Sequence, residues 1–312
     1  MGNTMYFTWE PALMVWLQSF MGPVLTQIAS FVTMFGEELI LIIVMGFLYW
    51  CYDKEYGTTV GISIIAGITL NAMLKSVVLR RRPYFDHEEI RCLKPVDSTA
   101  DIYDVSAQGY SFPSGHSMNS TIVYGSIAHC RKTGKLMHVL AVVLPFLVGL
   151  SRVMLGVHYP TDVIAGWAVG ALVVFLLPWL QAKFRSRSLF GLLLVLLMLP
   201  GVFFCRTNDY FTGLGLMIGF FLAIAFDKRY VNFKNVDFDD PKGILWCLLR
   251  LVGGAAVYFV LNSILKLPFS ESFLESATLG AFLVRTARYC IVSFVAIGVY
   301  PMVFSKVEKK RN

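Results

Sequence analysis

Three groups of ionisable and polar side chains interrupt the first half of an otherwise apolar chain, and the third group carries the strongest chemical signal. His158 is followed four residues later by Asp162, and Arg152 stands six residues before the histidine. If a helix begins near His158, this spacing places His158 and Asp162 on one face. The carboxylate can then hold one imidazole nitrogen protonated and leave the other free to attack an electrophile. A histidine alone is more often a packed residue, but an ionisable pair beside an arginine favours a nucleophile.

The second group is the run Pro113, Ser114, Gly115 and His116, which stands immediately before an apolar helix. The first backbone N–H groups of a helix have no partner within it, and the helix dipole favours an anion there. Ser114 supplies a hydroxyl, Gly115 lets the backbone approach an oxyanion closely, and His116 titrates near neutral pH. Helix capping alone would explain such a run, but its chemistry also fits a phosphate.

The first group consists of Lys75 followed by Arg82 and Pro83. A helix carries Lys75 toward the membrane interface, and Pro83 marks where that helix can no longer continue. Two cations then face one site. A lysine near a helix end can also lie at the interface simply to reach water. We interpret the neighbouring Arg80 and Arg81 in that second way, as ordinary flanking residues.

Membrane helices must position these groups, because the composition is that of a polytopic membrane protein. Apolar residues make up 56% of the 312 positions, charged residues make up 15%, and the mean hydropathy is +0.64. Apolar runs long enough to cross ~30 Å of hydrocarbon recur along the chain. The net charge of +7 lies in loops between these runs, where membrane orientation explains it better than a nucleic-acid partner does. We therefore expect an all-α membrane helix bundle.

Hydropathy predicts nine membrane-spanning helices after an N-terminal segment of a different kind. Residues 9–35 are apolar but are broken by Gly22 and Pro23 and carry scattered polar residues, as amphipathic helices in the membrane interface do. A full first span is the alternative for this segment. The nine spans are expected at residues 38–52, 56–79, 116–131, 136–155, 159–182, 189–205, 211–226, 244–267 and 280–304.

Basic residues gather in alternate loops of this arrangement, which indicates the loops that face the cytoplasm. The N-terminus, residues 80–115 and the loop near Gly156 then lie on the outer side, together with all three polar groups. We expect an integral protein of the bacterial plasma membrane whose active site faces the extracytoplasmic side. The basic residues are Lys54, Arg131, Lys132, Lys135, Lys183, Arg185, Arg187, Lys228, Arg229, Lys234, Lys242, Lys306, Lys309, Lys310 and Arg311.

The longest polar stretch, residues 86–109, joins the first polar group to the second. Loops of this length are either functional or disordered, so a structured cap over the site and a solvated connector are both open. No metal or other cofactor is expected. The six cysteines form no CxxC pair and no cluster with histidine, and Asp237, Asp239 and Asp240 fit a solvated turn on the cytoplasmic side.

Considered jointly, residues 75–83, 113–116 and 151–162 resemble the three signature motifs of the type 2 phosphatidic acid phosphatase (PAP2) superfamily, which includes the vanadium haloperoxidases. Every signature position is matched. The resemblance implies a helical core around the site. Beyond it, the layout is loosely similar to glucose-6-phosphatases and sphingosine-1-phosphate phosphatases. We expect interfacial helices in residues 1–35, a catalytic core in 36–185 and a transmembrane extension in 186–312.

The resemblance also implies a role for each site residue. His158 attacks phosphorus to give a phosphohistidine, Asp162 orients it, and His116 protonates the departing oxygen before it activates water. Positioning and electrostatics would supply most of the catalysis. Five further residues bind the phosphate: Lys75, Arg82, Ser114, Gly115 and Arg152.

A lipid phosphate is the expected substrate, because a site at the outer interface can receive a head group while the tail stays in the bilayer. The candidate substrates share the phosphate group that the motifs are expected to bind. They are polyprenyl diphosphate, phosphatidate, phosphatidylglycerol phosphate and sphingoid base phosphates. A soluble sugar phosphate, transfer to an acceptor other than water, and an inactive transporter or binding protein are alternatives. The transporter hypothesis rests on Arg250, Arg285 and Arg288, which we interpret instead as interfacial anchors. The sequence indicates no particular oligomeric state.

Overall fold

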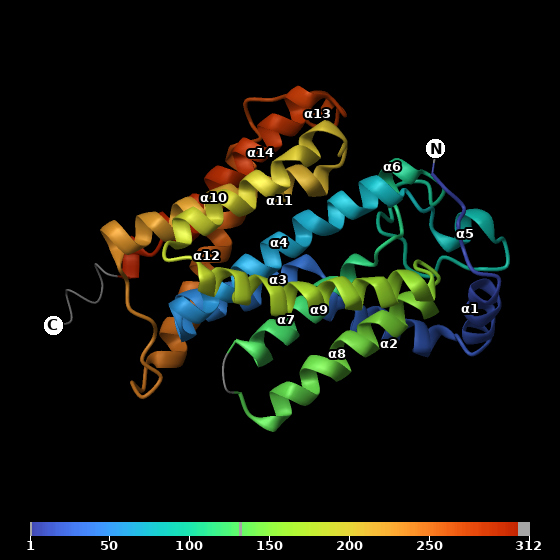
Figure 1. Cartoon of the computed structure of the whole chain (residues 1–312), viewed down its shortest axis with the longest axis horizontal. Helices are drawn as coiled ribbons and strands as arrows, with labels where there is room; N and C mark the ends of the chain where they lie inside the picture. Colours follow the sequence, from blue (N-terminus) through green and yellow to red (C-terminus); the bar gives the residue numbers. More distant parts are fainter. Residues whose placement is uncertain (1, 131–132, 305–312) are drawn as a thin grey trace. The chain divides into compact units, whose positions relative to one another are not determined.

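The computed structural model describes residues 2–130 and 133–304, and within these residues regular structure is helical apart from one parallel bridge between Asn3 and Arg80 (Figure 1). The all-α prediction is therefore confirmed. Six of the basic residues used to orient the chain lie outside the described residues: Arg131, Lys132, Lys306, Lys309, Lys310 and Arg311.

Each of the nine helices expected from hydropathy is present, and most ends agree within a few residues. The α-helices expected at residues 38–52, 189–205 and 280–304 end earlier, at Gly46, Met198 and Phe294. Three helices continue into a π-helical turn, at residues 47–52, 227–231 and 295–299. The nine helices are α3 (Glu38–Gly46), α4 (Lys54–Val78), α7 (Gly115–His129), α8 (Lys135–Met154), α9 (Pro160–Lys183), α10 (Arg187–Met198), α11 (Asn208–Phe226), α12 (Gly243–Ile264) and α14 (Leu279–Phe294).

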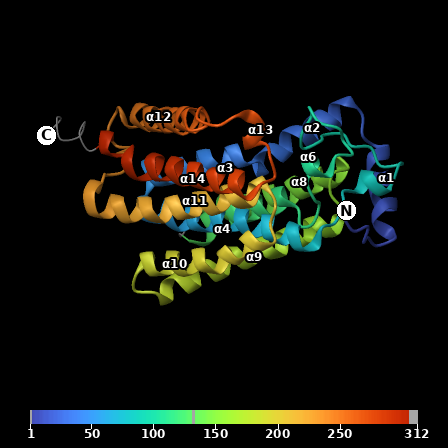
Figure 2. The ribbon, with the colours of Figure 1, turned by 90° about the horizontal axis from the view of Figure 1, so that it is seen from above.

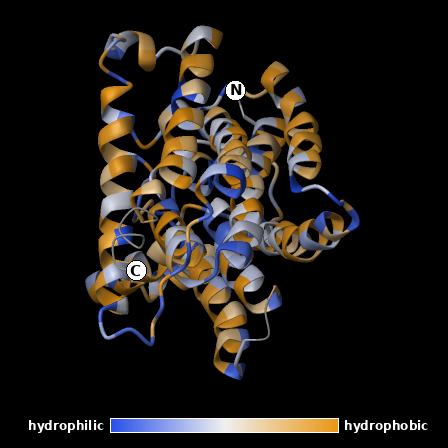
Figure 3. Ribbon diagram, turned by 90° about the vertical axis from the view of Figure 1, so that its left-hand side faces the viewer, coloured by the Kyte–Doolittle hydropathy of each residue, from blue (hydrophilic) through white to orange (hydrophobic). Residues whose placement is uncertain are grey.

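Six helices of the described residues are long and apolar enough to cross a membrane, or seven if the bent α1–α2 pair forms one span. These are α4, α8, α9, α11, α12 and α14, of which α11 and α14 include their π-helical turns. Figure 3 shows apolar residues along most of the helical ribbon and polar residues mainly in the connections. Helices α3, α7 and α10 are shorter, so the count of nine spans stays a prediction.

The N-terminal segment forms two short helices, α1 (Trp9–Ser19) and α2 (Pro23–Thr33). Their axes are bent by 119° at the break that Gly22 and Pro23 introduce, because a proline is accommodated at the first position of a helix but not inside it. Large aromatic side chains of α1 and the residue after it are exposed, including Trp16 and Phe20. Amphipathic helices at a membrane interface have this form.

The chain divides into two compact units. The first contains residues 1–41 and 70–178, and the second contains residues 42–69 and 179–312. In the first unit, α8 packs against α2 and α7, and a buried cluster that includes Met14, Ile90 and Leu155 joins α1 to the connections around the polar motifs. Two short helices, α5 (Pro83–Asp86) and α6 (Val105–Gln108), lie within those connections.

In the second unit, α11 and α14 run side by side, as Figures 1 and 2 both show. A side chain on Gly215 or Gly219 of α11 would come within 2.4 or 2.2 Å of the backbone oxygens of Thr286 and Cys290 in α14. Small residues allow this close approach of two backbones, which is a common way to pack helices in membranes. A short helix, α13 (Glu271–Leu274), precedes α14.

Candidate active site

All eight predicted site residues belong to the first unit, and the His158 and Asp162 pair is at their centre. The α9 helix begins at Pro160 rather than near His158, so the histidine lies in the preceding turn. The two side chains meet because Asp162 folds back over the helix N-terminus, where its Oδ2 accepts the Tyr159 N–H at 2.8 Å. The same oxygen lies 3.5 Å from His158 Nδ1. Both side chains are buried.

The turn that carries His158 depends on Gly156. Its φ is +79°, in the left-handed region that favours glycine. A Cβ at this position would lie 2.1 Å from the Arg91 carbonyl oxygen and 2.6 Å from Gln18 Nε2. The Val157 N–H donates to the Arg152 carbonyl at 3.2 Å and closes the turn. Glycine therefore satisfies both the backbone conformation and the close packing beside the histidine.

Arg82, from the first polar group, contacts the turn that carries His158. Its side chain is buried, and Nη1 donates to the Val157 carbonyl at 2.9 Å, one residue before His158. Its Nε donates to the carbonyls of Gln108 and Gly109 at 2.9 and 3.1 Å. The guanidinium thus joins residues 108–109 to the turn that carries His158, and its charge acts on His158.

The second polar group forms the start of α7, as expected. Ser114 precedes the helix, and its Oγ accepts from Ser117 Oγ at 2.9 Å, so its own O–H can donate to a ligand. The Ser114 N–H donates to the Asp162 carbonyl at 3.0 Å, which ties the start of α7 to the start of α9. Gly115 and His116 are the first two residues of α7, and both are half-buried.

Two further cations act on the same histidine through their charge. Lys75 is half-buried in the last turn of α4, and Arg152 is buried in the last turn of α8, where Nη1 donates to Thr33 Oγ1 at 3.2 Å. Burial lowers the pKa of His158 well below its usual value, and the positive charges of Arg82, Arg152 and Lys75 lower it further. His158 is therefore neutral at pH 7, as a nitrogen nucleophile must be.

Arg80 corrects the sequence interpretation, which treated it as a flanking residue. Its side chain is only 3% exposed, and Nη1 donates to Asp162 Oδ1 at 2.7 Å. Its Nη2 donates to Oε2 of Glu10, a buried α1 residue that the sequence motifs do not include, at 2.8 Å. A lone carboxylate at the start of an apolar helix was the available signal, because such a group needs a cationic partner.

The polar stretch of residues 86–109 is structured. The Gln108 side chain is buried, accepts the Val96 N–H at 2.9 Å and donates to the Asp97 carbonyl at 2.8 Å. At the other end of the stretch, Gln18 of α1 donates to the Arg91 carbonyl at 2.8 Å and accepts the Arg91 N–H at 3.0 Å. These contacts favour the structured cap over the solvated connector.

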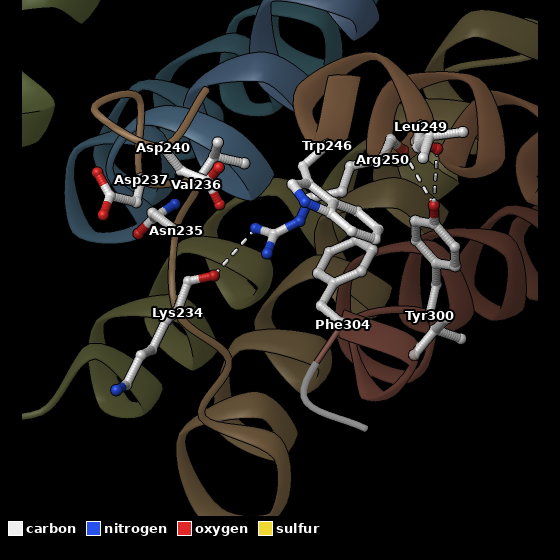
Figure 4. Close-up of a pocket in the computed structure, with 11 residues that line it drawn as sticks. Lys234, Asn235, Val236, Asp237, Asp240, Trp246, Leu249, Arg250, Tyr300 and Phe304 are labelled. Atoms are coloured by element: carbon white, nitrogen blue, oxygen red, sulfur yellow. Dashed lines mark hydrogen bonds between the residues drawn. The ribbon is translucent and has the colours of Figure 1, made fainter. Parts of the chain in front are cut away.

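A separate cavity of about 400 Å³ lies in the second unit (Figure 4). It is lined by Arg250, whose Nη1 donates to the carbonyls of Trp50 and Lys234 at 2.5 and 2.9 Å. Arg288 in the same unit is buried and donates to Asn262 Oδ1 at 2.7 Å. Both arginines link helices inside the protein, so the expectation that they are interfacial anchors is wrong.

Within the described part of the chain, no cluster of three or more His, Cys, Asp or Glu side chains could hold a metal ion. The arrangement around His158 instead combines a buried imidazole, a carboxylate partner, several cations and a helix N-terminus. Such a set can bind a phosphate group and attack its phosphorus.

Comparisons with known proteins identify phosphatases among the relatives of this chain. Residues 56–186 match the model of the PAP2 superfamily, and residues 211–312 match that of the transmembrane extension of PAP2 superfamily phosphatases. Phosphatidylglycerophosphatase B of Bacillus subtilis is 32% identical over 52% of this chain and 78% of its own length. The undecaprenyl-diphosphatase of Sulfolobus acidocaldarius is 31% identical over 49% of this chain and 68% of its own.

A solved structure also aligns with the chain. The PAP2 type phosphatidylglycerolphosphate phosphatase from Bacillus subtilis is 29% identical, with a TM-score of 0.44, over 57% of this chain and 86% of the other. The family assignment rests on the sequence matches. The chain belongs to the PAP2 superfamily, and it is an integral membrane hydrolase of phosphoric esters. Its relatives include phosphatases named for two different lipid phosphates.

Proposed function

We propose that this protein hydrolyses a lipid phosphate or diphosphate without a metal ion, through a phosphohistidine at His158, at the extracytoplasmic face of a bacterial membrane. The observation that carries the proposal is the buried pair of His158 and Asp162, 3.5 Å apart, under the combined charge of Lys75, Arg82 and Arg152. The division into interfacial helices, catalytic core and C-terminal extension is part of the same proposal.

The geometry supports a specific assignment of atoms. Nδ1 of His158 faces Asp162, so Nε2 is the nitrogen that attacks phosphorus. A bond forms between Nε2 and phosphorus while the bond from phosphorus to the leaving oxygen breaks, and Asp162 stabilises the positive charge that the imidazole gains. His116 in its imidazolium form, which the negative charge of a bound phosphate favours, donates a proton to the leaving oxygen and becomes neutral. Water, deprotonated by His116, then attacks the phosphohistidine and releases inorganic phosphate.

The phosphate oxygens require donors throughout this sequence. The backbone N–H groups at the start of α7, including those of Gly115 and His116, point along the helix axis away from its core. The Ser114 hydroxyl adds a donor, and Lys75, Arg82 and Arg152 supply the positive charge that balances the charge spread over the equatorial oxygens. Positioning and fixed charge therefore replace a metal in this proposal.

The lipid class is supported by the membrane helices and by the relatives. A phosphate carried on an acyl or prenyl tail can enter a site at the membrane interface while the tail remains in hydrocarbon, which contributes affinity of ~0.8 kcal/mol per buried CH₂. Exposed aromatic residues of α1, such as Trp16, fit an interfacial location near the site. The relatives' names place both a glycerophosphate and a prenyl diphosphate within the class.

The test is phosphate release by the purified protein in detergent with EDTA present. Polyprenyl diphosphate, phosphatidate, phosphatidylglycerol phosphate, sphingosine phosphate and glucose 6-phosphate are compared, with His158→Ala as the control. Release from one or more lipids, abolished by the variant and unaffected by EDTA, is the expected result. Preference for glucose 6-phosphate would overturn the lipid assignment, inhibition by EDTA would overturn the metal-free mechanism, and no release from any compound would overturn the proposed function.

A further inference from the structure

A chain of buried charges extends away from the catalytic pair. Asp162 Oδ1 accepts from Arg80 Nη1 at 2.7 Å, and Arg80 Nη2 donates to Glu10 Oε2 at 2.8 Å. The exposed fractions are 0% for Asp162, 3% for Arg80 and 0% for Glu10. Three charged side chains are therefore kept out of solvent beside the nucleophile. Taking charges out of water is costly, and breaking such a set is more costly still.

The second carboxylate also holds the helix that carries Asp162. Glu10 Oε1 accepts from both the backbone N–H and the hydroxyl of Thr161, at 3.0 and 2.6 Å. The Thr161 hydroxyl in turn accepts from Arg80 Nη1 at 2.7 Å. Glu10 thus fixes the first turn of α9 directly, and it fixes Arg80 at the same time.

Packing restricts the guanidinium further. Arg80 lies over the ring of Tyr159, with 4.0 Å from Cζ to the ring centroid. The Tyr159 backbone N–H is the group that donates to Asp162 Oδ2, the oxygen facing His158. The Arg80 backbone is held as well, by the bridge to Asn3 on the N-terminal segment. Contacts on both amino groups and on one face therefore restrict the guanidinium.

We propose that Arg80 and Glu10 are positioning residues, which hold the Asp162 carboxylate so that its second oxygen orients the His158 imidazole for attack. The inference rests on the proposed function, in which His158 is the nucleophile. Arg80 occupies one carboxylate oxygen and leaves the other for the histidine. Glu10 offsets the charge of Arg80, so that Asp162 keeps its capacity to stabilise the positive imidazole of the phosphorylated state.

The chemistry of a single substitution at each position follows from the contacts. In Arg80→Gln, Asp162 Oδ1 loses its charged donor, and the carboxylate can rotate. In Arg80→Lys, one ammonium group cannot reproduce the two-armed contact to Asp162 and Glu10. In Glu10→Gln, one oxygen becomes an NH₂ group, which faces either the Thr161 donors or the Arg80 and Phe7 donors. In either orientation, the glutamine NH₂ group therefore faces hydrogen-bond donors and cannot accept from them.

The experiment compares Arg80→Gln, Arg80→Lys and Glu10→Gln with Arg81→Gln as the matched control. Arg81 is the neighbouring arginine, its side chain is 33% exposed, and it pairs with Asp86 rather than with the site. The values of kcat and KM are measured on monodisperse protein, well below each variant's melting temperature, with the lipid that the wild type hydrolyses. We expect Arg80→Gln to lower kcat by about 10- to 100-fold, the range seen when the hydrogen-bond partner behind a metal-ligating histidine is removed.

The other variants give a predicted order of kcat values. KM should change by less than about threefold, because Arg80 and Glu10 do not contact the substrate. The kcat values of Arg80→Lys and Glu10→Gln should lie between those of the wild type and Arg80→Gln. Arg81→Gln should leave both constants unchanged. A wild-type kcat in Arg80→Gln, or an equal loss of kcat in Arg80→Gln and Arg81→Gln, would overturn the proposal.

A second readout is independent of turnover. Nitrogen-15 NMR of histidine-labelled protein gives the ring signals of His158, which are identified by their loss in His158→Ala. Arg80→Gln should shift these signals and Arg81→Gln should not, because the Asp162 contact sets the imidazole tautomer. If the wild type releases no phosphate from any compound, the proposed function fails. This spectrum alone then tests whether Arg80 and Glu10 position Asp162 and His158. Unchanged His158 signals in Arg80→Gln would refute that role.

Discussion

The backbone N–H of Ser114 donates to the backbone carbonyl of Asp162 at 3.0 Å. One hydrogen bond thus joins the start of α7, which we propose to bind phosphate, to the start of α9, which carries Asp162, the carboxylate partner of the proposed nucleophile. The two helices are close enough for this bond because Gly166 of α9 faces α7. The relative placement of the phosphate and the attacking histidine therefore depends on how closely these two helices pack.

Gly166→Ala should disturb that packing. A Cβ at Gly166 would lie 2.7 Å from the Ser114 carbonyl oxygen and 3.1 Å from Ser117 Cβ. In a free helix interior, alanine is more favourable than glycine by about 1 kcal/mol. We expect the opposite here, a lower melting temperature and a kcat reduced by about tenfold or more, because misplacing reacting groups by an ångström is costly.

The control for this variant is Gly134→Ala. Gly134 precedes α8 and has an ordinary negative φ of −66°, and a Cβ added there would meet no other atom within 4 Å. Its kcat should stay at the wild-type value, and its melting temperature should fall only slightly, because alanine is a poorer N-cap residue than glycine. A Gly166→Ala protein that is as stable and as active as Gly134→Ala would show that the contact between α7 and α9 does not set the geometry of the site.

Gly156→Ala should be the more damaging of two substitutions at positive φ. Gly156 has a φ of +79° and Gly109 has a φ of +68°, so alanine is strained by about 1–2 kcal/mol at either position. Only at Gly156 would the new carbon also collide with a backbone oxygen, that of Arg91, at 2.1 Å. We expect a modest fall in melting temperature for Gly109→Ala and a much larger one for Gly156→Ala, with loss of phosphate release. Equal melting temperatures would contradict this account of the His158 turn.

The helices were predictable from the sequence because their signals are local. The eight candidate site residues were chosen from signals of the same kind, and their roles stay a prediction. Apolar runs such as residues 136–155 correspond to α8 within one residue at each end, and the polar motifs stand at helix ends, where chain breaks and capping residues fix them. His158 and Asp162 meet as expected, although the helix begins at Pro160 and the contact arises from a carboxylate folded back over the helix start.

The contacts of Arg80 and Glu10 with each other and with Asp162 were not predictable in the same way. Glu10 and Arg80 are 70 residues apart, and nothing in the spacing of either indicates the other. Arg80 looks like a flanking arginine because it adjoins Arg81 and follows an apolar helix. Its burial depends on tertiary packing against Tyr159 and on the bridge to Asn3, which are contacts between distant parts of the chain. Arg250 was misjudged for the same reason, since its partners include the carbonyl of Trp50, 200 positions away.

Gln18→Ala should loosen the polar connection over the site. The Gln18 side chain donates to the carbonyls of Arg91 and Met154 at 2.8 and 3.2 Å and accepts the Arg91 N–H at 3.0 Å. Alanine would leave these backbone groups without their partner, at a cost of about 1–3 kcal/mol for a buried group. We expect faster proteolysis within residues 86–109. Ser19→Ala, which loses only an exposed contact to the Trp16 carbonyl, is the control, and equal cleavage of the two variants would refute the role of Gln18.

The lowered pKa of His158 gives the stability of the protein a defined pH dependence. In the unfolded chain, the histidine takes up a proton near pH 6.5, whereas in the folded protein it takes up a proton only at a much lower pH. Between those two values the unfolded state binds more protons, so stability is lost as the pH falls below about 6.5. In His158→Gln this contribution is absent. We therefore expect the melting temperature of the wild type to fall more than that of His158→Gln between pH 7.5 and pH 5, values chosen to lie on either side of the usual histidine pKa of about 6.5. Parallel curves for the two proteins in differential scanning fluorimetry would mean that His158 is not held neutral in the folded state.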